Sequence, residues 1–129
     1  MNVKKLCAVY SLLVGISIAL VWIIYFATGA VMGIKPEAAG LSFHIAAEFA
    51  AAAAMIAAGL GLLANRGWAR DIYFLSMGLL FYALINSPGY YISGGGRLII
   101  AVFAGSFLLA LIFTALGIVC LKDNNNSIK

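Results

Sequence analysis

The chain has 129 residues, of which 65% are hydrophobic and 9% are charged. Soluble domains usually carry about 25% charged residues, so this composition excludes an ordinary water-soluble domain. The net charge of +4 does not indicate a nucleic-acid partner, because the basic residues are scattered between apolar runs and form no basic face. We therefore expect one domain embedded in a lipid bilayer.

Four apolar stretches follow one another, each near the length of about 20 residues that a membrane-spanning helix needs. They cover residues 6–32, 41–64, 69–86 and 98–121. The first is about twice as long as the apolar core of a signal peptide, so we predict a retained spanning helix. The third is the shortest, and Pro88 leaves two alternatives for its end: the helix unwinds there, or it kinks and continues.

Short connections between the stretches predict that consecutive helices are antiparallel neighbours. The predicted fold class is thus all-α: an integral membrane four-helix bundle with up-down-up-down topology over residues 1–121, followed by a polar cytoplasmic tail at 122–129. An N-terminus on the cytoplasmic side satisfies the positive-inside rule. In this orientation the basic residues on the cytoplasmic side are Lys4, Lys5, Arg66, Arg70, Lys122 and Lys129, and those on the outer side are Lys35 and Arg97. We expect both termini inside a prokaryotic cell, with the chain crossing the inner membrane several times.

The second stretch is unusually rich in small residues. Ala50, Ala54 and Ala58 recur every four residues, and Gly29 and Gly33 form a GxxxG pair near the end of the first stretch. Small residues let helices approach closely in lipid. Two interpretations stay open: close packing inside this bundle, or a contact with a second copy or a partner subunit in the membrane.

His44 and Glu48 interrupt the apolar surface of the second stretch. They are the only histidine of the chain and the only acidic residue well inside a predicted span. Four residues apart on a helix, they share one face and differ in depth by about 6 Å. A charged side chain at the bilayer centre costs roughly 2.5–3.5 kcal/mol, so such residues usually face the bundle interior or a wet cavity and have a partner.

Polar residues at a similar predicted depth on the other helices are candidate partners for this pair. We predict a pocket at the outer end of the bundle, above a floor of Met55, Trp22 and Phe81. Its candidate ligand-binding residues are His44, Glu48, Tyr82, Asn86, Tyr25 and Arg97, with Thr28 nearby. Two other interpretations are polar contacts that lock the helices together and a proton-handling pocket. A metal site is disfavoured, because two ligands fall short of the three or four that a stable site needs.

Part of the chain resembles the DoxX-like group of small four-helix bacterial and archaeal membrane proteins. The resemblance covers about residues 43–86 and depends on Glu48, the glycine-rich segment 59–63 and the basic turn with Arg66 and Arg70. It implies a four-helix membrane subunit, linked in some members to quinone or thiol redox chemistry. Glu48 and Arg66 are the pattern positions that it carries over.

No motif in the sequence fixes a reaction or a cofactor. The chain lacks a phosphate-binding GxxxxGK loop, a GxSxG elbow and an HExxH helix, so enzymatic activity is not predicted. We expect a small membrane protein that binds a hydrophobic, lipid-like molecule or a quinone, as an accessory redox subunit would. The alternatives are a structural or regulatory membrane subunit, and a small proton-coupled transporter.

Overall fold

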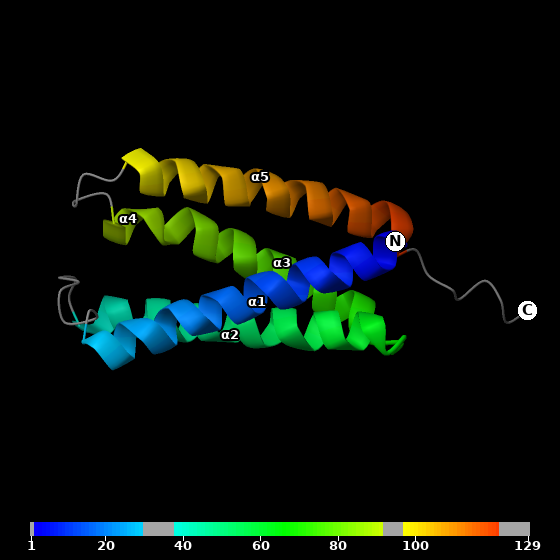
Figure 1. Ribbon diagram of the computed structural model, residues 1–129, viewed down its shortest axis with the longest axis horizontal. Coiled ribbons are helices and arrows are strands. Elements are labelled where there is room, and N and C mark those ends of the chain that lie inside the picture. Colours follow the sequence, from blue (N-terminus) through cyan, green and yellow to red (C-terminus); the bar gives the residue numbers. More distant parts are fainter. Residues whose placement is uncertain (1, 30–37, 92–96, 122–129) are drawn as a thin grey trace, which may run out of the picture.

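The computed structural model describes residues 2–29, 38–91 and 97–121, and the side chains of residues 38, 39, 90, 91 and 97 lie outside that description. All the regular structure in these ranges is helical. The helices are α1 (Val3–Thr28), α2 (Ala38–Leu63), α3 (Ala69–Asn86), the short α4 (Pro88–Tyr91) and α5 (Arg97–Cys120). Successive long helices run in opposite directions (Figure 1), which confirms the predicted all-α four-helix fold.

Three of the described helices are long and apolar enough to cross a membrane. They are Val3–Thr28, Gly40–Leu63 and Leu98–Cys120. The predicted third span is not among them, because Arg70 and Asp71 in the first turn of α3 and Asn86 at its end lower its hydropathy. The third stretch is helical over the predicted residues 69–86, and its crossing of the membrane stays a prediction.

Local signals fix both ends of α1. The side chain of Asn2 caps the start by accepting a hydrogen bond of 3.2 Å from the backbone N–H of Lys4. Gly29 ends the helix with φ of +70°, a left-handed conformation that glycine adopts without steric cost. The helix thus ends at Thr28, four residues before the predicted boundary. Gly29 is a helix cap, and no atom of the described residues lies within 4 Å of a Cβ atom added there. Gly33 lies outside the described residues.

The turn between α2 and α3 carries a helix-ending Schellman motif. The backbone N–H of Arg66 donates to the carbonyl of Gly61 at 2.9 Å, and Asn65 takes the left-handed conformation with φ of 54°. The side chain of Lys4 donates to the side-chain oxygen of Asn65 at 2.9 Å. The start of α1 is therefore attached to this turn.

The end of α3 is a kink. The helix ends at Asn86, but Ser87 keeps helical dihedral angles and donates its backbone N–H to the carbonyl of Ala83. Pro88 then begins α4, and because it has no N–H it cannot continue the regular hydrogen bonding of α3. Of the two predicted alternatives, the chain kinks and continues, through Tyr91 at the limit of the described residues.

Small residues bring α1 and α2 into close contact. A Cβ atom added at Gly15 would lie 2.9 Å from the carbonyl oxygen of Ala52, and one added at Gly59 would lie 2.8 Å from that of Ala8. Ala51, Ala52 and Ala58 of α2 are buried inside the bundle. The predicted ridge is only partly correct, because Ala58 is buried and Ala50 is exposed.

Helix α5 is held firmly near its C-terminal end. Tyr73 of α3 is fully buried and donates its hydroxyl to the carbonyl of Phe113 at 2.7 Å. A Cβ atom added at Gly117 of α5 would lie only 2.6 Å from the ring of Tyr73. Phe113 also stacks on Tyr10 of α1, with ring centroids 3.9 Å apart. Toward its N-terminal end, α5 separates from α1 (Figure 1), and a groove opens between them.

Candidate functional site

The groove between α1 and α5 has a volume of about 520 Å³ and is open to the surroundings. One face of α1, from Tyr10 to Tyr25 at helical spacing, forms one wall. Helix α5 forms the facing wall and α3 contributes the bottom. The lining is mostly apolar, and its polar groups are Tyr10, Ser17, Tyr25, Glu48, Ser87 and Ser106. Its volume lies within the range of roughly 300–1,000 Å³ that is usual for small-molecule sites.

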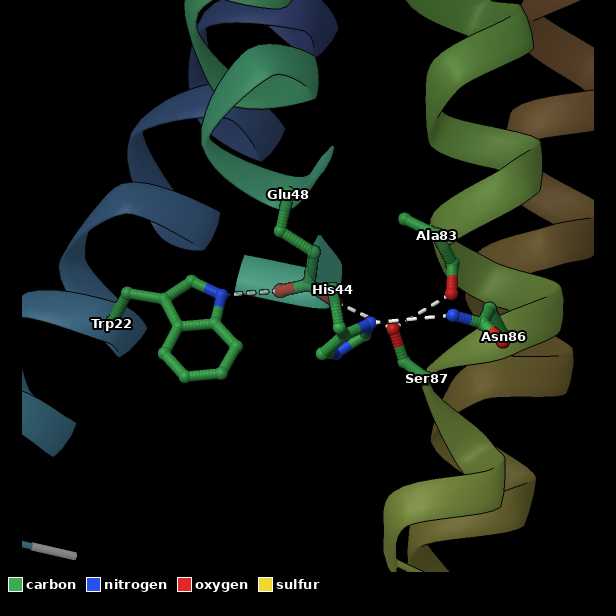
Figure 2. Close-up of polar contacts among 6 residues, drawn as sticks. All are labelled: Trp22, His44, Glu48, Ala83, Asn86 and Ser87. Atoms are coloured by element: carbon green, nitrogen blue, oxygen red, sulfur yellow. Dashed lines mark hydrogen bonds and ion pairs between the residues drawn. The ribbon is translucent and has the colours of Figure 1, made fainter. Parts of the chain in front are cut away.

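Glu48 of α2 lies at one end of this groove, at the centre of a hydrogen-bonded cluster. Its Oε2 accepts a hydrogen bond of 2.5 Å from the indole N–H of Trp22 on α1. Its Oε1 lies 2.5 Å from the hydroxyl of Ser87, which follows α3. Figure 2 shows the carboxyl group between these two side chains. Three helical segments therefore converge on one carboxyl group, whose side chain is 15% exposed.

His44 completes the cluster one helical turn from Glu48. Its Nε2 lies 3.3 Å from Oε1 of Glu48, and its Nδ1 faces the amide nitrogen of Asn86 at 3.5 Å. When Nδ1 accepts from the Asn86 amide, the ring is neutral and its proton resides on Nε2. Nε2 faces Glu48 in this arrangement but forms no hydrogen bond with it.

Ser87 can interact with Glu48 in two ways. Its Oγ lies within hydrogen-bonding distance of Glu48 and also 2.7 Å from the carbonyl oxygen of Ala83. A serine hydroxyl has one proton, so it donates to one of these oxygens at a time. It donates to an ionised Glu48, and it accepts from a protonated Glu48 while donating to Ala83. The cluster thus accommodates the carboxyl group with or without its proton.

The structure brings together only some of the predicted site residues. His44 contacts both Glu48 and Asn86, and Tyr25 lines the groove with its ring 5.8 Å from that of Trp22. The remaining assignments do not join the cluster or cannot be placed. Tyr82 is 56% exposed and is not among the described residues that line the groove. Thr28 donates to the carbonyl of Ile24 in its own helix, and the side chain of Arg97 lies outside the described residues.

Two residues of the cluster were missed or misinterpreted in the sequence. Trp22 was expected as apolar floor, yet its indole N–H is a direct donor to Glu48. Ser87 was not considered, although its position before Pro88 at a helix end was a usable signal. Arg66, a pattern position of the DoxX-like resemblance, lies on the turn after α2. It is separated from Glu48 by more than four helical turns, roughly 25 Å along the helix.

The chemistry available at this site is hydrogen bonding and proton exchange next to an apolar groove. Among the described residues, no three His, Cys, Asp or Glu side chains gather in one place. Within residues 2–29, 38–91 and 97–121, the groups that could contact a molecule in the groove are therefore the Glu48 carboxyl and nearby hydroxyls.

Comparison with known proteins identifies a family. The model of the family described as domain of unknown function DUF8058 matches residues 1–129. No curated protein and no solved structure matches the chain. The chain therefore belongs to the DUF8058 family.

Proposed function

We propose that this DUF8058 family member is a membrane protein that takes up a lipid-like molecule from the bilayer into the groove between α1 and α5. The apolar part of the molecule lies along the groove, and its polar group forms a hydrogen bond with Glu48. The observation that carries the proposal is the position of the carboxyl group at the end of an open, mostly apolar groove.

A membrane setting explains why such a groove is useful. Three of the described helices are long and apolar enough to span, and most residues of α5 are exposed, many of them large and apolar. In a bilayer these residues contact lipid tails, so a lipid-like molecule reaches the groove sideways. The start of α1 and the turn after α2 lie at the end of the bundle where α5 finishes (Figure 1). Lys4 lies in that start and Arg66 in that turn. By the positive-inside rule we place this end in the cytoplasm of a prokaryotic cell and Glu48 toward the outer surface.

The groove can be blocked at one residue. Ser106 of α5 lines it, so Ser106→Phe should fill it without changing the Glu48 cluster. Ala115→Phe is a matched control, because Ala115 is exposed on the same helix and does not line the groove. We expect native mass spectrometry of the purified protein to detect a retained apolar molecule with the wild type and with the control. Ser106→Phe should lose it.

The same experiment shows whether the groove binds a molecule at all. If the wild type retains nothing, or if both phenylalanine variants retain the same molecule, the groove is not a binding site. Unfolding measurements on all three proteins show whether the loss in Ser106→Phe results from misfolding instead.

A structural role is the second candidate, and one specific observation favours it. Glu48 receives hydrogen bonds from α1 through Trp22 and from the end of α3 through Ser87. Such a bridge would fix helix packing even without a ligand, as in a structural or regulatory subunit. In that case Glu48→Gln lowers the free energy of unfolding while no bound molecule is found in any variant. Asp71→Asn is the control, because it makes the same carboxylate-to-amide change at an exposed position of α3.

A further inference from the structure

We infer that the molecule in the groove carries an ammonium group, so that the site selects lipophilic amines over neutral or acidic amphiphiles of equal size. This inference rests on the proposed function and names its ligand class. It follows from the charges around the groove, from the donors that already reach Glu48, and from the aromatic rings beside it.

The charges in the groove are unbalanced when Glu48 is ionised. Among the described residues that line it, Glu48 is the only Asp, Glu, Lys or Arg. The described side chains around the carboxylate are the indole of Trp22, the hydroxyl of Ser87 and the imidazole of His44. The first two are neutral, and His44 is neutral when its Nδ1 accepts from Asn86. Buried charges are normally paired, so a cation in the groove would complete the site.

The hydrogen-bonding capacity of Glu48 also favours a donor. A carboxylate has about four acceptor positions. Within the described residues, two hydrogen-bond donors reach it, Trp22 at Oε2 and Ser87 at Oε1, while Nε2 of His44 lies 3.3 Å from Oε1 without forming a hydrogen bond with it. One acceptor position on Oε2 is left for a group in the groove that Glu48 lines. An ammonium N–H fills it with a charge-assisted hydrogen bond, which is about twice as strong as a neutral one.

Other polar groups fit this position less well. A carboxylate or phosphate would face Glu48 with a like charge, and no cation is among the described residues that line the groove. A ketone or quinone carbonyl only accepts hydrogen bonds, so it contacts Glu48 favourably only when the acid is protonated. An amine is compatible with both states, because a protonated Glu48 can transfer its proton to the amine nitrogen and give the same ion pair. The ring of Tyr25, which lines the groove near Trp22, adds a surface that attracts cations.

A series of amphiphiles with one chain length tests the inference. Dodecylamine, dodecanol and dodecanoate are added at equal mole fraction to the purified full-length protein in neutral detergent, and the thermal unfolding midpoint is measured. A ligand that binds the folded state raises this midpoint. We expect dodecylamine to raise it more than dodecanol, with no rise for dodecanoate. The excess of amine over alcohol should disappear in Glu48→Gln and persist in the control Asp71→Asn.

The results distinguish a wrong ligand class from a wrong groove. If dodecanol stabilises as strongly as dodecylamine and Ser106→Phe abolishes both effects, the amine inference is wrong and the proposed groove stands. If no amphiphile stabilises the wild type, both fail. If the amine effect is equal in wild type and Glu48→Gln, it reflects the micelle charge and overturns the inference.

Two sources could supply such a group, a free amine or the headgroup of an aminolipid. Dodecylphosphoethanolamine carries an ammonium beside a phosphate and distinguishes them. Stabilisation equal to that by dodecylamine supports the ammonium assignment and identifies the headgroup as the source. Stabilisation by dodecylamine alone supports the assignment with a free amine.

Discussion

The close contact between α1 and α2 gives the sharpest stability prediction, because one substitution can be compared at two glycines. In Gly59→Ala, the added Cβ would lie 2.6 Å from Cγ of Leu12 and 2.8 Å from the carbonyl oxygen of Ala8. Carbon atoms pack best about 3.5–4.0 Å apart, so the first contact is about 1 Å too short. Leu12 can change its rotamer, but the backbone oxygen of Ala8 moves only if α1 moves.

The magnitude follows from two opposing effects. Overpacking of this kind costs about 1–3 kcal/mol, and a backbone obstacle favours the upper half of that range. The greater helix propensity of alanine stabilises the folded state by up to about 1 kcal/mol and partly offsets this cost. We expect Gly59→Ala to lower the free energy of unfolding by about 1–2 kcal/mol. Gly105→Ala on α5 has nothing within 4 Å of the added Cβ, so we expect it to be neutral or stabilising by up to about 1 kcal/mol.

Reversible unfolding in mild-detergent micelles with increasing dodecyl sulfate, followed by circular dichroism, measures both variants. The prediction is a difference in sign between two chemically identical changes. Equal shifts for Gly59→Ala and Gly105→Ala would refute the argument, because they would show that α1 and α2 are not packed closely at Gly59.

Three further variants test individual hydrogen bonds by the same unfolding measurement. Trp22→Phe removes a buried donor to Glu48, and we expect a loss of about 1–3 kcal/mol; no loss would mean that this bond is not formed. Tyr73→Phe removes the hydroxyl that donates to the carbonyl of Phe113, and we expect it to lower the free energy of unfolding by about 0.5–1.5 kcal/mol. A smaller loss would show that this bond does not attach α5 to α3. Lys4→Ala breaks an exposed contact with the α2–α3 turn and should change stability by less than about 0.5 kcal/mol.

Much of the fold could be predicted because it depends on local composition. The apolar runs predict the long helices, and the turn-forming residues between them predict antiparallel neighbours. The exceptions also have local causes. Gly29 ends α1 early because it takes a positive φ, and Arg70 with Asp71 makes α3 less apolar than its length suggested. The spacing of His44 and Glu48 was sufficient to predict that they share a face and lie near each other.

What the sequence by itself determined about this protein is therefore the number, order and direction of its helices and the presence of one polar pair in the second. Only the tertiary structure decided which side chains meet that pair, because residue depth does not determine how a helix is rotated about its axis. Rotation directs Trp22 and Ser87 toward Glu48 and leaves Tyr82 exposed. The groove likewise depends on packing between distant segments: Tyr73 holds one end of α5 against α3, and the other end separates from α1.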